Sequence, residues 1–197
     1  MRKHFASALV LLAFSISVVA QDKPPKVELF GGYSYLNFKV KLGFDRAFDV
    51  DRQSASGLGI NISANLTSRL GIVGDGSYNT KGVQIPAIFG PNKINVQHTY
   101  FLFGPRLSFR RDKATAFLQG LAGGAHIRDE FGHLHTTTDL ALAIGGGLDL
   151  NVSRRLAVRA VQLDYLPSRR RLSSSTDKEW LQNFRIQFGV VFRFGGD

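Results

Sequence analysis

Hydrophobic and polar residues alternate along the last stretch of the chain. Every second residue from Phe184 to Phe194 is apolar, and the residues between them are mostly polar or small. This period-2 alternation predicts a β-strand with one wholly apolar face. A tilted strand needs about 9–11 residues to cross a bilayer. The strand predicted over residues 181–194 is long enough to do so.

Seven earlier segments show the same alternation, some of them less cleanly. They predict strands over about residues 27–38, 58–66, 70–79, 96–109, 115–126, 138–150 and 156–166. Tight turns near residues 67–69, 110–113 and 151–155 alternate with four long connections, near residues 39–56, 80–95, 127–137 and 168–180. Short turns on one side and long loops on the other are typical of a transmembrane barrel. The predicted fold is all-β, an eight-stranded antiparallel up-and-down transmembrane β-barrel.

Two local features refine this pattern. In the seventh predicted strand, Arg159 has the opposite parity to Gln162 and Asp164, which predicts a β-bulge or an arginine at the membrane interface. Residues 65–70 resemble residues 151–156, two hairpins later, so the same turn chemistry is expected to recur on one side.

Aromatic residues divide between the two ends. If alternate strands run in opposite directions, all five Tyr and Trp180 fall in the half with the long loops. Phe109, Phe117, Phe192 and Phe194 fall near the short turns. This division predicts aromatic girdles at the two membrane interfaces, with Tyr100 as the member whose parity suggests an inward direction.

The alternation does not itself say which face lines the lumen. A soluble lipocalin-like barrel would enclose the Leu, Ile and Phe set and bind an apolar ligand. Three observations favour the inverse arrangement. Gly and Ala crowd the less apolar face, as a narrow eight-stranded lumen requires. The apolar faces carry almost no charge, and the chain begins with an export signal.

That signal occupies residues 1–20. Arg2, Lys3 and His4 precede an apolar stretch at residues 5–19, and small residues at 18–20 form a cleavage site. The apolar stretch is shorter than the roughly 20 residues that a spanning helix needs. We therefore expect a cleaved signal peptide at 1–20 and a barrel domain at 21–197.

The last strand resembles the C-terminal strand of bacterial outer-membrane barrels, which usually ends in an aromatic residue that the insertion machinery reads. Here Gly195, Gly196 and Asp197 follow the final aromatic residue. Together with residues 145–155 and 161–165, this makes the mature chain resemble the eight-stranded, OmpA-like outer-membrane β-barrel family. The resemblance implies insertion by the barrel assembly machinery into the cell outer membrane, among its lipids and lipopolysaccharide. The peptidoglycan-binding domain that often follows such barrels is not expected.

Charge excludes other classes of function. Of 25 basic side chains, Arg2 and Lys3 lie in the leader, which leaves 23 against 15 acidic ones and a net charge of +8. The sequence carries no nucleic-acid motif and no basic helix, so we expect no nucleic-acid partner. Cys is absent, which excludes a disulfide scaffold and any site built on Cys.

Charged residues on the less apolar face predict a network in the lumen, because unpaired charge in a narrow interior is unfavourable. Its expected members are Asp75, Arg106, Asp149, Asp164, Arg185 and Arg193. Structural filling is the expected role, and a gated polar plug is the alternative. Arg169, Arg170 and Arg171, near the predicted outer rim, are candidates for contact with lipopolysaccharide phosphates.

Other residues suggest chemistry only weakly. A third-loop group rich in His and acidic residues matches no metal-site spacing; it contains His126, Asp129, Glu130, His133 and His135. Residues 173–175 are three serines without a nucleophile elbow. The glycines at 145–147 lack the Lys of a phosphate loop and indicate strand packing. We expect no catalytic residue, metal or cofactor.

The predicted function is therefore an outer-membrane barrel with a structural, adhesive or narrow-pore role and no enzymatic activity. A soluble periplasmic or secreted ligand-binding barrel is the first alternative. An outer-membrane lipid-modifying enzyme is the second. The sequence does not define the loop partner, the conduction of ions, the oligomeric state or the effect of residues 195–197 on insertion.

Overall fold

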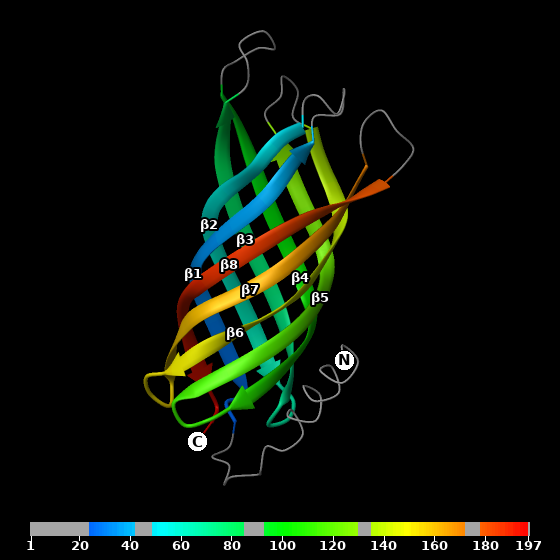
Figure 1. The fold of residues 1–197 in the computed structure, drawn as a ribbon. Coiled ribbons are helices and arrows are strands. Elements are labelled where there is room, and N and C mark those ends of the chain that lie inside the picture. The colour runs from blue at the N-terminus through cyan, green and yellow to red at the C-terminus, as the bar shows by residue number, and fades with distance from the viewer. Residues whose placement is uncertain (1–23, 42–48, 85–92, 130–134, 172–177, 197) are drawn as a thin grey trace, which may run out of the picture.

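In the part of the chain that the structure describes, eight antiparallel strands close into a barrel (Figure 1). The computed structural model describes residues 24–41, 49–84, 93–129, 135–171 and 178–196. The strands are β1 (Val27–Lys41), β2 (Asp49–Asn65), β3 (Leu70–Gln84), β4 (Lys93–Arg110), β5 (Ala114–Asp129), β6 (His135–Asn151), β7 (Leu156–Arg171) and β8 (Lys178–Phe194). Each strand pairs with its neighbour in sequence, and β8 closes the barrel on β1. The predicted fold class is confirmed. The expected signal peptide lies outside the described residues, which contain no helix long and apolar enough to cross a membrane.

The strands extend further toward the loops than the sequence pattern indicates. Both ends of the connection expected near residues 80–95 belong to the ladder, because Lys81 pairs with Val96 and Gln84 with Lys93. Individual strands contain 15 to 18 residues, whereas about 9–11 are needed to cross a bilayer. The alternation of apolar and polar side chains ends where the lipid ends, but backbone pairing does not depend on that alternation. The predicted long loops were therefore too long.

The short turns share one end of the barrel with the start of β1 and the end of β8 (Figure 1). Thr67 Oγ1 accepts hydrogen bonds from the backbone N–H groups of Arg69 and Leu70. Ser153 Oγ accepts the equivalent bonds from Arg155 and Leu156. The predicted repeat of turn chemistry is confirmed. We call this the turn end and the opposite end the loop end.

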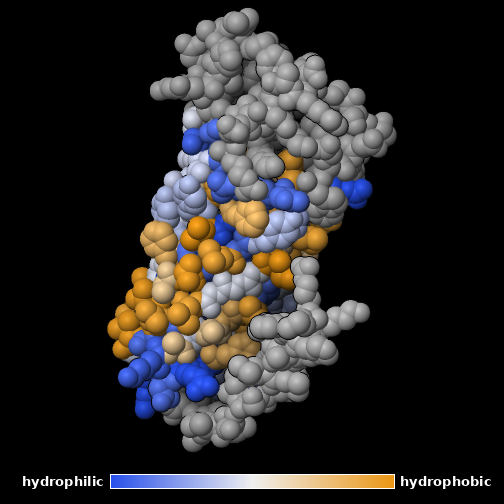
Figure 2. Space-filling view, in the orientation of Figure 1, coloured by the Kyte–Doolittle hydropathy of each residue, from blue (hydrophilic) through white to orange (hydrophobic). Residues whose placement is uncertain are grey.

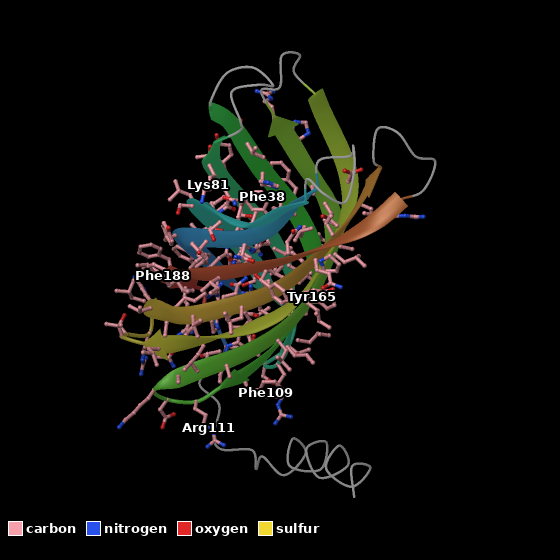
Figure 3. All side chains as sticks on the ribbon, turned by 45° about the horizontal axis from the view of Figure 1, so that its top comes forward. Phe38, Lys81, Phe109, Arg111, Tyr165 and Phe188 are labelled. Atoms are coloured by element: carbon pink, nitrogen blue, oxygen red, sulfur yellow. The ribbon has the colours of Figure 1, made fainter. Side chains whose placement is uncertain are left out.

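The outer face carries the apolar residues of the alternating pattern. Leu58 is 71% exposed, and Phe101 and Ile144 are each 67% exposed. Figure 2 shows apolar side chains gathered as a band on the visible flank, with hydrophilic residues below it at the turn end, and Phe188 points outward from β8 in Figure 3. The soluble-barrel alternative requires these residues inside and is therefore wrong.

The aromatic girdle is partly as predicted. Tyr33 and Tyr35 are exposed on β1 and donate hydrogen bonds of 2.6 Å to Ser56 Oγ and Ser54 Oγ. Tyr100 is buried in the lumen, as its parity suggested, and Phe117 is buried there as well. Phe117 was expected at the turn-end girdle, but strand β5 directs it inward to fill the lumen beside glycine.

The lumen is filled at three levels along the strands. An apolar cluster, mostly in the loop-side half, contains Leu36, Phe38, Ala55, Val73, Tyr100, Leu102, Leu121, Ala125, Ala141, Ala143 and Leu166. Buried arginines and carboxylates occupy the middle, and a smaller charged group lies at the turn end. The core of this protein is thus the barrel interior.

The predicted bulge is present in β7. The pairing of β7 with β8 shifts register between Arg159 and Gln162, and the pairing of β6 with β7 shifts beside Leu148 and Asp149. The extra residue brings Arg159, Gln162 and Asp164 to the same inner face despite their opposite parities. A bulge re-aims a side chain in this way.

A charge placed on the apolar band tests the membrane-facing assignment. We expect Ile62→Arg to lower the free energy of unfolding in lipid vesicles by about 2–4 kcal/mol, since Ile62 lies near the middle of the band. Thr80→Arg, on the exposed loop-side extension of β3, is the matched control and should change stability by under ~0.5 kcal/mol. Urea titration followed by tryptophan fluorescence measures both. Equal, small effects would contradict the assignment.

Candidate functional site: a charged network in the lumen

Arg185 on β8 is the centre of the charged network. Its Nη1 lies 2.7 Å from Asp75 Oδ1 on β3, and its Nη2 lies 2.8 Å from Asp164 Oδ2 on β7. Nη1 also donates a 2.9 Å hydrogen bond to Ser77 Oγ. The side chains of all three charged residues are completely buried. One guanidinium therefore joins two carboxylates across the barrel interior.

Asp164 connects this cation to the rest of the network. Its Oδ2 accepts hydrogen bonds from Arg185 and from Gln162 Nε2, at 2.8 Å each. Its Oδ1 accepts a 3.0 Å bond from Gln119 Nε2. The Gln119 oxygen in turn accepts 3.2 and 2.7 Å bonds from Arg106. A carboxylate with this many donors remains solvated by protein groups while excluded from water.

Arg159 forms a second centre. Its Nε and Nη2 bind the two oxygens of Asp149 at 2.7 and 3.2 Å, a bidentate pair. Its Nη1 donates a 2.7 Å bond to the Gln162 oxygen, which links it to Asp164. The guanidinium carbon also lies 4.3 Å from the Phe30 ring centre and 4.5 Å from that of Phe117. The described residues around this buried cation thus provide a carboxylate, an amide oxygen and two ring faces.

Glycines make space for these groups. A Cβ at Gly147 would lie 2.6 Å from Phe117 Cζ, and one at Gly145 would overlap Asp164 Oδ1. Within the glycine run at 145–147, Gly145 and Gly147 therefore leave room for side chains from the neighbouring strands. This supports its interpretation as strand packing.

A separate group lies toward the turn end. Arg110 binds Glu28 at 3.1 Å, and Arg193 Nε lies 3.7 Å from the same carboxylate oxygen. Arg193 also donates to Asn151 Oδ1 at 2.7 Å and to Thr115 Oγ1 at 3.2 Å. The lumen residues predicted from the sequence divide between the two groups. Asp75, Asp164 and Arg185 are in direct contact, and Asp149 and Arg106 join them through other side chains. Arg193 belongs to the group at the turn end.

Sequence reasoning did not place four contributors in the lumen: Glu28, Gln119, Arg159 and Gln162. Gln119 lies in a strand whose two faces both mix apolar and small residues. The parity conflict at Arg159 indicated the bulge, and following it one step further would have placed Arg159 inside. Glu28 shares its parity with Phe30 and Ser34, which was a usable signal.

The remaining candidates lie elsewhere. Arg169, Arg170 and Arg171 end β7 and pair with Trp180, Glu179 and Lys178 of β8, so they belong to the strand ladder rather than to a loop. Glu130, His133 and the serines at 173–175 lie outside the described residues. Among the residues that the structure does describe, no group of three or more His, Asp or Glu side chains is positioned to hold a metal ion.

A closed antiparallel barrel with an apolar outer band and a lumen of paired charges defines a transmembrane β-barrel. Residues 6–194 match the family model of the outer membrane protein β-barrel domain. The chain belongs to this family, and its location is the outer membrane. A search of curated proteins found no match.

Solved outer-membrane barrels share the fold at low identity. Neisserial surface protein A has a TM-score of 0.62 at 9% identity, covering 86% of this chain and 97% of its own. OprG from Pseudomonas aeruginosa has a TM-score of 0.56 at 10% identity, covering 87% and 97%. Ail, the attachment invasion locus protein of Yersinia pestis, has a TM-score of 0.53 at 16% identity, covering 86% and 99%. At these identities the similarity defines the fold and leaves the activity open.

Removing the central cation tests the network. We expect Arg185→Met to destabilise the barrel by about 3–5 kcal/mol, because it leaves two buried carboxylates without their cation. Adding Asp75→Asn and Asp164→Asn to that variant should restore much of the loss, since the uncompensated charges are then gone. Urea unfolding in lipid vesicles measures each step. Absence of rescue would mean that the loss arises from packing volume instead of charge.

Proposed function

We propose that this protein is a closed, non-conducting outer-membrane barrel that supports a binding surface at its loop end. The observation that carries the proposal is the filled lumen. Arg106, Arg159 and Arg185 are each at most 2% exposed, and an apolar cluster overlies them toward the loops. Eight strands leave an interior just wide enough for side chains. Of the structural, adhesive and narrow-pore roles, a filled interior favours the first two.

The strand extensions support a role at the cell surface. The outward-facing residues beyond the apolar band are polar, and the exposed ones include Ser56, Thr80, Arg128, Arg169 and Gln182. A rigid ladder that continues past the lipid would present loops well above the membrane. Ail, whose name records attachment, has the same fold. An adhesive or ligand-binding role therefore agrees with the geometry, and we propose no enzymatic activity.

Lipopolysaccharide is the ligand we propose for the end of β7. Arg169 is exposed, and the ladder holds the backbones of Arg170 and Arg171 in the same strand end. Guanidinium groups bind phosphate in a bidentate manner. This end of the barrel faces the outer leaflet if the short turns are periplasmic.

Conductance measures the closed lumen directly. We expect the wild-type barrel, inserted in a planar lipid bilayer, to show no stepwise current at moderate voltage, because charged and apolar side chains fill its interior. Heat-dependent mobility on a denaturing gel should establish that the inserted protein is folded. Reproducible unit openings by the folded protein would overturn the non-conducting role and favour the narrow pore.

Lipopolysaccharide binding is tested separately. Changing Arg169, Arg170 and Arg171 to Ser should weaken binding of the purified barrel to lipopolysaccharide micelles by roughly tenfold, equivalent to about 1.4 kcal/mol. The control changes Lys81, Lys93 and Arg128 to Ser, which removes the same charge at the same end of the barrel but leaves the end of β7 intact. Unchanged affinity in the first variant, or an equal loss in both, would refute the proposed contact.

A further inference from the structure

Four basic residues occupy equivalent positions at the turn end. Each of them immediately precedes a strand that runs from the turn end to the loop end. They are Lys26 before β1, Arg69 before β3, Lys113 before β5 and Arg155 before β7. All four side chains are exposed. We call them the basic ring.

One hydrogen bond recurs at every ring position. The backbone carbonyl of each ring residue accepts a hydrogen bond from the backbone N–H group of the residue opposite it on a neighbouring strand. The donor and acceptor pairs are Asn65 to Lys26 (2.8 Å), Ser108 to Arg69 (2.7 Å), Asn151 to Lys113 (2.9 Å) and Arg193 to Arg155 (2.9 Å). These bonds continue the strand ladders by one residue beyond their ends. The ring is therefore part of the rigid barrel and spaces its cations evenly around the circumference.

The ladder also defines the face to which the ring belongs. Directly opposed residues of an antiparallel pair project to the same side of the sheet. The partners Ser108 and Arg193 are buried in the lumen, and Asn65 and Asn151 continue the lumen-facing parity of their strands. The four cations thus surround the mouth of the lumen at the turn end.

Two further arginines lie just inside this mouth. Arg110 and Arg193 both approach Glu28, and the Nε atom of each is buried without a hydrogen-bond acceptor among the described residues. Donors in this state are usually satisfied by water or by a bound acceptor. The single carboxylate is already shared by two cations. Two cations against one carboxylate therefore leave the inside of the mouth with a net positive charge.

The charge balance of this end is strongly positive. Its described cations are Lys26, Arg69, Arg110, Arg111, Lys113, Arg154, Arg155 and Arg193, and its described anions apart from the paired Asp149 are Glu28 and Asp112. Figure 3 shows Arg111 extending from this end, away from the barrel. Such an excess attracts anions and repels the amine of a zwitterionic headgroup.

The position of the basic ring relative to the membrane indicates which class of anion it would bind. Val27 and Leu70 follow the ring directly and face the lipid, and Leu66 and Val152 in the turns are 61% and 63% exposed. The apolar band thus reaches almost to the ring, which puts the cations at the level of the lipid headgroups. Long basic side chains bury their stems there and direct their charge to the headgroups. Short turns face the periplasm in such barrels.

We propose that the basic ring binds the phosphate of anionic phospholipids from the periplasmic leaflet. The site lies at the end opposite to the surface-binding role and does not depend on it. It would anchor the barrel in that leaflet and set its depth. Nothing in this proposal requires a catalytic step.

Lipid retention by the folded barrel tests the site. The full mature chain in detergent micelles is titrated with phosphatidylglycerol or phosphatidylethanolamine, and bound lipid is counted by native mass spectrometry. We expect phosphatidylglycerol to bind about tenfold more tightly, through several charge contacts. Replacing Arg69, Lys113 and Arg155 by Gln should reduce that preference to within about twofold.

The control variant carries Lys81→Gln, Lys93→Gln and Arg128→Gln, which removes the same charge at the loop end and should keep the preference. Gel mobility before and after heating verifies that each variant is folded. If both variants lose the preference for phosphatidylglycerol equally, net charge alone explains the effect and the proposed site is wrong. The lipid proposal would also be wrong if inorganic phosphate competes for the site and the barrel shows no preference for phosphatidylglycerol. The mouth would then bind a free anion.

Discussion

Closure of the backbone hydrogen-bond ladder is the constraint on which the rest of the structure depends. A bilayer offers no partner for a free strand edge, so every N–H and C=O group in the hydrocarbon must pair within the protein. Here β8 pairs with β1 through eleven consecutive residue pairs, from Val27 with Phe194 to Asn37 with Phe184. The alternating C-terminal strand is therefore the element that completes the barrel, and its apolar face is the last part of the lipid surface.

Closure with only eight strands makes a narrow interior, and this determines what the inner faces carry. Large side chains must alternate with glycine, as where Gly147 accommodates the Phe117 ring. Polar side chains must find partners inside, because no bulk water reaches them. The cross-barrel pairs of Arg185 with Asp75 and Asp164 meet that demand and also link strands that are not neighbours. Replacing such pairs by apolar groups is often tolerated in other proteins, so the presence of these pairs is not by itself evidence of added stability.

The sequence predicts the features that depend on local alternation. Strand number, turn positions and the β7 irregularity at Arg159 follow from residue parity. The outward direction of the apolar face also required the Gly and Ala content of the other face, the lack of charge on the apolar face and the export signal. Parity cannot supply which inward residues meet across the lumen, because Asp75 and Arg185 are separated by 110 positions and join only through closure. It also fails where both faces are alike, as at Gln119 and Phe117 in β5. The strand extensions beyond the lipid were missed since pairing there leaves no hydrophobic signature.

The two ends of the lumen differ in a way that parity alone conceals. Toward the loops the interior is closed by apolar side chains such as Phe38 and Leu102, so its outer entrance offers little to an ion. Toward the turns it opens onto cations held in register by the ladder itself. A path for ions would have to traverse both the apolar layer and a set of cations already bonded to carboxylates. This filling is the physical basis of the non-conducting role proposed above. Under that proposal the two rims, rather than the lumen, are the surfaces available to other molecules.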